Sequence, residues 1–472
     1  MLTVGLLLEA LLGHPVAGAA QVITDAVVDS RLVIPGALFV ALPGERADGH
    51  DYVGAAFEKG AAVALVERDL PAGLPVLDLR GPRPAPPATL AFPLALRVES
   101  ALAALQQAAA FWRGRLEARV IGITGSVGKS TTKEVTAELL EVRYRTLKNP
   151  GNLNNEIGLP LTLLRLTEAH ERAVLEMGFY VPGEIALLCR LARPAVGVIT
   201  NLSPVHMERA GSLQAIFEGK SELVQALPPA PDGVALLNRD EPLVMQMAER
   251  TRARVFTYGL DPTADLWASE VEGLGLEGVR FVLHYQGEHV HLRVPMLGRH
   301  SVHTALRATA VGLVEGLTWQ EIVYGLQSAQ SQLRLVAVQG PDGCLLLDDT
   351  YNAAPASVTA ALNLLAELEG RKVAVLGDML ELGEYEERGH RMVGARAAAV
   401  AEALVTVGPR ARWIAEEALR AGLPSAGVLA FDDVGAAIEH LRRAVREGDV
   451  VLVKGSRGMH MDQIVAALED RP

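Results

Sequence analysis

The sequence predicts an α/β protein of three domains: a small mixed α/β N-terminal domain, a central domain with a doubly wound parallel sheet and a P-loop, and a C-terminal Rossmann-like domain. Three observations support this prediction. The chain has 472 residues, and domains commonly contain roughly 100 to 200 residues. Short apolar strands alternate with helical segments along most of the chain. A proline-rich segment separates the first part from the rest.

The first domain is predicted to span residues 1–96. Its amino-terminal segment, MLTVGLLLEALLGH, is apolar but is interrupted by Glu9 and lacks a basic region, which predicts a helix of the mature protein. Short apolar strands are expected at 38–42 and 61–67, with turn residues between them. The thirteen residues from Gly81 to Pro93 contain five prolines, so this segment can sustain neither a helix nor a central strand.

The second domain is predicted to span residues 97–328. It begins with a helix over Ser100–Leu116, and the β-branched strand ARVIGIT, a glycine-rich turn and another helix follow. Buried strands are expected at 173–177 and 196–201, each leading into helical sequence. This order is the one that a parallel doubly wound sheet requires.

The third domain is predicted to span residues 329–472. Four apolar segments, CLLLDD, KVAVLGD, ALVTVG and DVVLVKGS, are each followed by helical sequence. Such alternation is typical of a Rossmann-like unit.

Composition limits the classes of function. The net charge is 44 − 56 = −12 and no block of Lys or Arg stands out, which argues against a nucleic-acid or membrane partner. The two cysteines, Cys189 and Cys344, lie in apolar segments without metal-ligand spacing, so buried reduced thiols are expected. No window reaches the ~18 to 20 apolar residues of a membrane span. These features predict a soluble, cytoplasmic protein.

The strongest local signal is the motif IGITGSVGKS at residues 121–130. Its glycines allow a tight turn in which backbone N–H groups and the N-terminus of the next helix face phosphate oxygens. Lys129 is expected to reach the β- and γ-phosphates of ATP, and the Ser130 hydroxyl to ligate Mg²⁺. Ile123 stands where the strict Walker pattern has glycine. The residues predicted to bind ATP here are Thr124, Gly125, Ser126, Val127, Gly128, Lys129, Ser130 and Thr131.

Two further residues are candidates for the metal site. Glu176 ends one predicted strand and His206 follows the next, so both lie at the carboxyl ends of parallel strands, where open α/β sheets bind ligands. A carboxylate and an imidazole there can hold Mg²⁺ against ATP. Taken singly, each is also a residue type common at surfaces and helix caps. Lys220, in IFEGKSELVQ, has the surroundings of an exposed helix lysine.

At this point the sequence resembles a known family, the Mur ligases, from residue 29 to the last helix. The segments that carry the resemblance are, in chain order, DSRLVIPGALFVALPGERADGHDYV, GITGSVGKSTTKE, NPGNLNNEIGLPLTLL, LEMG, TNLSPVHMERAGS, GKSEL, PMLGRHSVHTAL, LLLDDTYNAAPASV, VAVLGDMLELGEYEERGH and VLVKGSRGMHMD. Within the family, NLNNEIGLPLTLL, LGDMLELG and KGSRGM resemble the members that add D-alanyl-D-alanine. The DNPR-type motif of the diaminopimelate-adding relative is absent.

The resemblance implies an enzyme that uses ATP and Mg²⁺, with two ions expected, to join D-alanyl-D-alanine to UDP-N-acetylmuramoyl-tripeptide through an acyl phosphate in peptidoglycan synthesis. A monomer is expected. The alternatives are another Mur-type ligase, a folylpolyglutamate synthase-like ligase, and a non-catalytic nucleotide-binding scaffold.

The resemblance also implies roles for individual residues. Those expected to bind the UDP end, in the first domain, are Ser30, Arg31, Asp48, Gly49 and His50. Those expected on the acceptor side of the central site are Asn152, Asn154 and Asn155. Lys220 matches a lysine that is carbamylated in related ligases, and its carbamate would join Glu176 and His206 around Mg²⁺.

The remaining implied residues surround the nucleotide base and the third domain. His300 matches the GxHNxxN element near the adenine, with Ser301 and Thr304 in place of its asparagines; a hydroxyl can still form one hydrogen bond. The residues expected to close over ATP, across a hinge at 328–335, are Arg334, Asp349, Tyr351 and Asn352. Those that match the KGSR loop, expected at the substrate, are Lys454, Ser456 and Arg457. Ala354 replaces a usual Asn and is assigned no contact.

Overall fold

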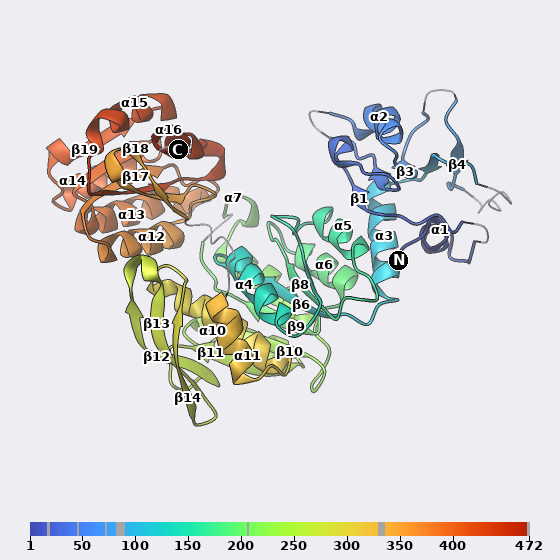
Figure 1. Cartoon of the computed structure of the whole chain (residues 1–472), viewed down its shortest axis with the longest axis horizontal. Coiled ribbons are helices and arrows are strands. Elements are labelled where there is room, and N and C mark those ends of the chain that lie inside the picture. Colours follow the sequence, from blue (N-terminus) through green and yellow to red (C-terminus); the bar gives the residue numbers. More distant parts are fainter. Residues whose placement is uncertain are drawn as a thin grey trace.

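Three β-sheets organise the computed structural model, which describes residues 1–16, 19–44, 47–70, 73–81, 90–204, 207–328 and 336–469. Figure 1 shows the amino-terminal and carboxy-terminal sheets on opposite sides of the central one. The predicted three-part α/β architecture is confirmed. The predicted hinge lies outside the described residues beyond Ser328. No helix in the described ranges is both long and apolar enough to span a membrane.

The first sheet is small and entirely parallel. Its strands, from one edge to the other, are β1 (Ala26–Val27), β2 (Leu38–Val40), β3 (Val63–Val66), β5 (Leu94–Arg97) and β4 (Val76–Asp78). Its helical elements are α1 (Val4–Leu12), α2 (Val53–Glu58), η1 (Ser30–Leu32) and η2 (Gly49–Tyr52). Helix α1 confirms the predicted amino-terminal helix, and the Thr3 hydroxyl caps it by accepting from the Leu6 N–H.

The central sheet is parallel over most of its width and has an antiparallel extension that the sequence analysis did not predict. Its strands, in spatial order, are β14 (Glu288–Val294), β13 (Val279–Tyr285), β12 (Leu266–Gly273), β11 (Arg254–Gly259), β10 (Val234–Asn238), β9 (Val196–Ile199), β6 (Arg119–Thr124), β8 (Arg172–Glu176) and β7 (Thr146–Lys148). Strands β7 to β12 pair in parallel, and β12, β13 and β14 pair antiparallel.

Helices cover both faces of this sheet, as a doubly wound fold requires. Those packed in the apolar core of one face are α3 (Ala101–Arg113), α5 (Gly158–Leu164), α6 (Glu184–Ala192) and α8 (Leu213–Gln225). Those on the other face are α4 (Lys129–Glu141), α10 (Val302–Val314) and α11 (Trp319–Ser328). The shorter elements are α7 (Met207–Ala210), α9 (Pro242–Met245), η3 (Gln246–Arg250), η4 (Gly275–Glu277) and η5 (Arg299–Ser301).

The third sheet is parallel except for its edge strand β15. Its strands, in spatial order, are β15 (Val336–Gln339), β16 (Leu345–Asp349), β20 (Asp449–Lys454), β17 (Arg371–Gly377), β18 (Ala403–Val407) and β19 (Val428–Phe431). Its helical elements are α12 (Pro355–Glu367), α13 (Glu386–Val400), α14 (Arg412–Arg420), α15 (Val434–Ala444), α16 (Asp462–Leu468), η6 (Pro341–Gly343), η7 (Gly383–Tyr385), η8 (Ser425–Gly427) and η9 (Arg457–Met459). The predicted strand and helix alternation is confirmed.

Helix α3 joins the first two sheets into one core. It packs against α1 and β3 on one side and against α5 and α6 on the other, and Figure 1 shows it running between the two units. Buried side chains from both units, among them Leu7, Leu105 and Leu188, form a single apolar cluster. This shared core fixes the first domain against the central one.

Arg113 anchors the end of α3. Its buried guanidinium donates to the carbonyls of Ala192, Leu116 and Ala118, each at 2.8 Å. The three acceptors lie at the last residue of α6, after α3 and just before β6. One side chain therefore connects the helix that carries the first domain to the sheet that carries the site.

We predict that Arg113→Met lowers the free energy of unfolding by about 3 kcal/mol, because it leaves buried carbonyls without donors. Chemical denaturation followed by circular dichroism measures the change. Arg115→Met is the matched control, because Arg115 is exposed and contacts Glu9 at 3.4 Å, and surface ion pairs contribute only about 0 to 1 kcal/mol. Equal destabilisation by the two variants would contradict the anchoring role.

Candidate active site

The glycine-rich motif forms a sharp turn between β6 and α4. Gly125 has a φ of +144°, and a Cβ there would lie 1.9 Å from the Thr200 Oγ1, so only glycine fits. Gly128 precedes α4 with a φ of +83°. Gly125 is therefore required for both its backbone conformation and the space it leaves, and Gly128 for its positive φ. Residues 126–131 line a cleft.

Side chains after β9 hold this turn in place. Asn201 accepts hydrogen bonds from the backbone N–H of Ser126 through its carbonyl and from that of Val127 through its side chain, both at 2.9 Å. The Thr200 hydroxyl donates to the Val127 carbonyl at 2.7 Å. The Thr124 hydroxyl donates to the Met177 carbonyl and is buried, so it supports the turn from behind rather than lining the cleft.

Lys129 lies over the turn. Its ammonium donates to the carbonyls of Gly125 at 3.0 Å and Ser126 at 3.3 Å. The first turn of α4, which includes Ser130 and Thr131, faces the same cleft. A helix N-terminus and an ammonium together form a site that attracts anions.

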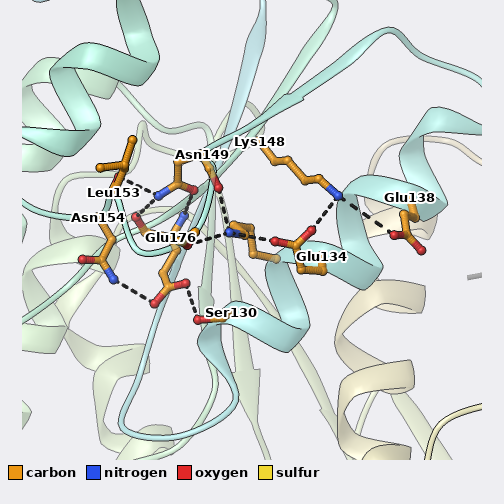
Figure 2. A network of polar contacts seen from close by, with 10 residues as sticks. Ser130, Glu134, Glu138, Lys148, Asn149, Leu153, Asn154 and Glu176 are labelled. Carbon is orange, nitrogen blue, oxygen red and sulfur yellow. Dashed lines mark hydrogen bonds and ion pairs between the residues drawn. The ribbon is translucent and has the colours of Figure 1, made fainter. Parts of the chain in front are cut away.

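Glu176 ends β8 beside this turn, where the sequence analysis placed it, and is only 2% exposed. Figure 2 shows its carboxylate between two donors: Oε2 accepts from the Ser130 hydroxyl at 2.6 Å, and Oε1 accepts from the Asn154 amide at 2.9 Å. Both donors are neutral, and the carboxylate and the Ser130 hydroxyl offer oxygen atoms. This donor set suits a hard divalent cation.

Lys220 is buried, which corrects its interpretation as an exposed helix lysine. It projects from α8, is 1% exposed, and donates to the Gly125 carbonyl at 3.1 Å. Its ammonium also lies 4.7 Å from the centre of the Phe179 ring. Burial and then the nearby Lys129 charge hold the pKa of Lys220 well below its usual value. The composition of α8 misled the sequence analysis, because Gly219 lets the helix pack directly on Phe179.

Two further residues, Ser130 and His206, were predicted to bind the metal. Ser130 contacts Glu176 as described, and His206 lies outside the described residues. Within the described ranges, no group of three His, Cys, Asp or Glu side chains is arranged to hold a metal ion.

The opposite wall of the cleft comes from the third sheet. Asp349 ends β16 and Lys454 ends the neighbouring β20, in register with each other. The Lys454 ammonium, 2% exposed, donates to Asp349 Oδ2 at 2.7 Å and to the Asn352 carbonyl at 2.9 Å. Arg457 lies 5.8 Å from the centre of the Tyr351 ring. These residues and Ser456 line the same cleft as the phosphate loop, and Arg334 lies outside the described residues.

The cleft has a volume of about 570 Å³ and collects most of the predicted nucleotide residues. His300 and Thr304 line it from η5 and α10, together with Ser301. The Ser301 hydroxyl already donates to the Leu297 carbonyl at 2.6 Å. His300 is an exposed residue, but the protein atoms around its ring, and then the neighbouring His303, Lys454 and Arg307, lower its pKa to about 4.

Sequence reasoning missed several residues of this cleft. Arg307 is 5% exposed and donates to the Thr132 hydroxyl at 3.0 Å and the Tyr258 hydroxyl at 3.1 Å, close behind Gly128. His303 contacts Asp240 at 2.8 Å. Others in the lining are Asn201, Asn238, Glu241 and Tyr180. Helical spacing offered a signal, because positions 303, 304 and 307 share one face of α10 and His300 lies just before this helix, in η5.

Two groups of predicted residues lie away from the cleft. Asn155 accepts from the N–H of Gly158 at 2.9 Å and so caps the start of α5. The others, in the first domain, are Ser30, Arg31, Asp48, Gly49 and His50, and none of them lines the cleft.

The first-domain residues are tied to their own neighbours. The Arg31 guanidinium pairs with Asp29 at 2.7 Å and is largely exposed. His50 is buried; its Nδ1 lies 2.6 Å from Asp48 Oδ1, and its Nε2 accepts from the Glu67 N–H at 2.9 Å. His50 therefore has an internal role in holding this loop.

Cys189 and Cys344 are both buried, as predicted. Burial raises the pKa of the Cys189 thiol.

Comparison with known proteins covers nearly the whole chain. Three family models match: "Mur ligase family, catalytic domain" over residues 23–113, "Mur ligase middle domain" over 123–312, and "Mur ligase, glutamate ligase domain" over 333–457. The UDP-N-acetylmuramoyl-tripeptide--D-alanyl-D-alanine ligase of Bacillus subtilis is 38% identical, over 96% of this chain and 94% of the relative. The Escherichia coli enzyme of the same name is 37% identical, over 96% and 95%.

Solved structures agree with these matches. MurF from Acinetobacter baumannii superposes with a TM-score of 0.82 at 30% identity, over 98% of this chain and 97% of that one. MurF ligase from Thermotoga maritima, in complex with ADP, gives 0.77 at 27%, over 94% and 96%. The phosphate loop, Glu176 and the loop of Lys454, Ser456 and Arg457 line one cleft, and the relatives match nearly the whole chain. The chain belongs to the Mur ligase family.

Proposed function

We propose that this protein joins D-alanyl-D-alanine to UDP-N-acetylmuramoyl-tripeptide, with ATP cleaved to ADP and phosphate. The observation that carries the proposal is the convergence of the phosphate loop, Glu176 and the KGSR loop in one cleft. The relatives that share nearly the whole sequence bear the name of this activity. The product is the UDP-muramoyl-pentapeptide used in peptidoglycan synthesis.

We propose that ATP binds at the junction of the central and third sheets, where the cleft lies. We infer that the first turn of α4 and the Lys129 ammonium neutralise the β- and γ-phosphates, as in other P-loop sites. Arg307 adds a buried positive charge directly behind Gly128. The base is assigned to the side of His300 and Thr304, and Asp349, Tyr351 and Asn352 cover the nucleotide from the third sheet.

Mg²⁺ fits the oxygen atoms beside the phosphate loop. Glu176 is a buried carboxylate whose described partners, Ser130 and Asn154, are neutral donors, so a cation would relieve the cost of its charge. We propose Ser130, Glu176, His206 and a carbamylated Lys220 as the residues that hold two ions. When bound, Mg²⁺ supplies charge neutralisation for the transferred phosphoryl group.

Burial makes Lys220 a suitable site for carbamylation. Among the described residues it is surrounded by the Gly125 carbonyl, the Phe179 ring and the like charge of Lys129. These surroundings favour the neutral amine, which is the form that adds to CO₂. The carbamate carries a negative charge and offers oxygen atoms next to the phosphate loop.

The substrates are assigned by position. We propose that residues 1–96 bind the UDP end through Ser30, Arg31 and the loop at Asp48–His50, and that Asn152, Asn154 and Asn155 belong to the acceptor side. Residues 97–328 bind ATP. Residues 329–472 deliver the dipeptide, with Lys454, Ser456 and Arg457 at the substrate.

The reaction follows from the chemistry of a carboxylate, whose oxygen is a poor leaving group. An oxygen of the tripeptide carboxylate attacks the γ-phosphorus of ATP and forms an acyl phosphate. The bond between the γ-phosphorus and the β,γ-bridging oxygen breaks, and ADP leaves. The amine of D-alanyl-D-alanine then attacks the carbonyl carbon, the bond to the phosphate oxygen breaks, and phosphate and a proton leave. Lys129 and the amides of α4 hold the phosphates in line, and closure of the third domain excludes water from the acyl phosphate.

A product assay tests the proposed function. Purified protein with ATP, UDP-muramoyl-tripeptide and D-alanyl-D-alanine is expected to give the UDP-muramoyl-pentapeptide and one phosphate for each product, measured by mass spectrometry and phosphate release. Diaminopimelate, lysine and glutamate serve as competing amines in parallel reactions. Product formed only with one of these would favour another Mur-type or folylpolyglutamate synthase-like ligase, and product with none would reject the proposal.

Glu176→Gln keeps the shape of the side chain and removes its charge. We expect kcat to fall about 100-fold or more, because the metal loses an anionic ligand at the phosphoryl group. The Mg²⁺ concentration for half-maximal phosphate release is expected to rise. Glu138→Gln, at the outer end of the same polar network, is the control and should match the parent. An unchanged Mg²⁺ dependence in Glu176→Gln would argue against metal binding by this carboxylate.

Carbamylation of Lys220 is testable by labelling. Protein equilibrated with isotopically labelled bicarbonate is expected to show one carbamate signal by NMR, and Lys220→Arg should lose it, because a guanidinium stays protonated. The signal should grow as the pH rises, since only the neutral amine reacts. Lys148→Arg, at a partly exposed lysine, is the control. A signal that persists in Lys220→Arg would place the carbamate elsewhere.

A further inference from the structure

We propose that Lys133 and Asn149 are positioning residues that lock the acceptor loop, residues 149–155, to the phosphate-binding helix α4 and to Glu176. The proposal rests on the proposed function in one respect, namely that Asn152 and Asn154 of this loop face the UDP-linked acceptor. Neither Lys133 nor Asn149 lines the cleft. Both are completely buried, so a direct contact with substrate is not their role.

Asn149 continues the sheet where β7 ends. Its side-chain oxygen accepts from the Glu176 N–H at 2.9 Å, and its side-chain amide donates to the Glu176 carbonyl at 3.2 Å. The same amide donates to the Leu153 carbonyl at 2.9 Å (Figure 2). The Asn149 side chain thus pairs with the backbone of Glu176 as a neighbouring strand would. It also holds Leu153 close, so that the loop turns back toward Asn149.

Lys133 attaches this loop to α4. Its ammonium donates to the carbonyls of Asn149 at 2.7 Å and Gly151 at 3.1 Å. It lies one helical turn after Lys129 and Ser130, on the helix that begins at the phosphate loop. The backbone of the acceptor loop is therefore fixed to the element that is proposed to hold the γ-phosphate.

A buried ammonium requires charge compensation, and the chain supplies it from outside the cleft. Glu134 lies 2.9 Å from Lys133 and 2.5 Å from Lys148, and Glu138 lies 4.0 Å from Lys148. Although burial alone would raise it, the hydrogen bonds from Lys148 and Lys133 hold the pKa of Glu134 below its usual value. The carboxylate that pairs with Lys133 is thus one that does not line the cleft.

The hydrogen bonds around Glu176 form a closed ring that joins α4, β8 and the acceptor loop. Ser130 and Asn154 bind its carboxylate, Asn149 binds its backbone, and Lys133 joins the Asn149 backbone to the helix of Ser130. An error in the loop position therefore changes the distance between the acceptor and the phosphoryl group, and such misplacement reduces rate strongly. This ring of hydrogen bonds therefore sets the distance between the UDP-linked acceptor and ATP.

Lys133→Met tests this role, with Lys148→Met as the matched control. Both remove one ammonium bound to Glu134, but only Lys133 contacts the loop backbone. Hydrogen exchange of peptides covering 149–156 is measured by mass spectrometry on the full-length protein, which requires no activity. In Lys133→Met, exchange is expected to quicken by about 10-fold or more, the scale of one lost charge-assisted hydrogen bond. Lys148→Met is expected to exchange like the parent.

Steady-state kinetics separate positioning from general loosening. Lys133→Met is expected to raise the KM for UDP-muramoyl-tripeptide about 10-fold, with the KM for ATP within about 2-fold of the parent because Lys129 and its turn are unaltered. Lys133→Gln, which keeps one N–H donor, serves if Lys133→Met does not fold, and the same directions are expected. Unchanged exchange over 149–156, or equal increases in both KM values, would overturn the proposal. Failure of the product assay with the parent protein would reject the proposed function and leave the exchange result interpretable.

Discussion

The burial of one carboxylate, Glu176, organises the whole site. An ionised carboxylate at 2% exposure is costly unless several donors and a cation compensate it. Among the described residues, its two donors come from different elements, Ser130 from α4 and Asn154 from the acceptor loop. The need to satisfy this charge therefore holds together the phosphate-binding helix and the acceptor loop, and it leaves a place where a divalent cation is favourable.

The electrostatics of the cleft differ from those of the whole chain. The net charge is −12, yet Lys129, Arg307, Lys454 and Arg457 all lie at the cleft. Arg307 donates to two hydroxyl groups, so its charge is not cancelled by these hydrogen bonds. The cleft lining also carries the carboxylates of Glu176, Glu241, Asp349 and Glu381. Positive charge therefore lies beside the phosphate loop, at Lys129 and Arg307, rather than over the whole cleft.

Much of this site could be predicted from local sequence, because strand, turn and helix are consecutive around Gly125 and Gly128. Glu176 could be placed as well, since the carboxyl ends of parallel strands meet at one edge of a sheet. The burial of Lys220 could not be predicted, because it depends on Gly219 allowing α8 to approach Phe179, where a Cβ would lie 2.0 Å from the ring. Such a contact between distant segments leaves no periodic pattern.

Other failures have different physical causes. The antiparallel strands β13 and β14 were missed because a short turn joins them, so they lack the order of strand and helix that a parallel sheet requires. Arg307 was missed although helical spacing from His300 would have indicated it. The roles of Arg31 and His50 came from family resemblance alone, and the hydrogen bonds of His50 assign it first to its own loop.

The third domain must act on the cleft as one body, because its three cleft loops are bonded to one another. Lys454 joins β20 to Asp349 and Asn352. The Ser456 hydroxyl accepts from the Leu380 N–H at 2.8 Å, and the Ser456 N–H donates to the Asp378 carbonyl at 3.0 Å. Loops after β16, β17 and β20 therefore cannot approach the nucleotide separately. In the proposed reaction, water is excluded from the acyl phosphate only when all three loops arrive together. The hydrogen bonds that stabilise this domain would then couple the proposed delivery of the dipeptide to closure.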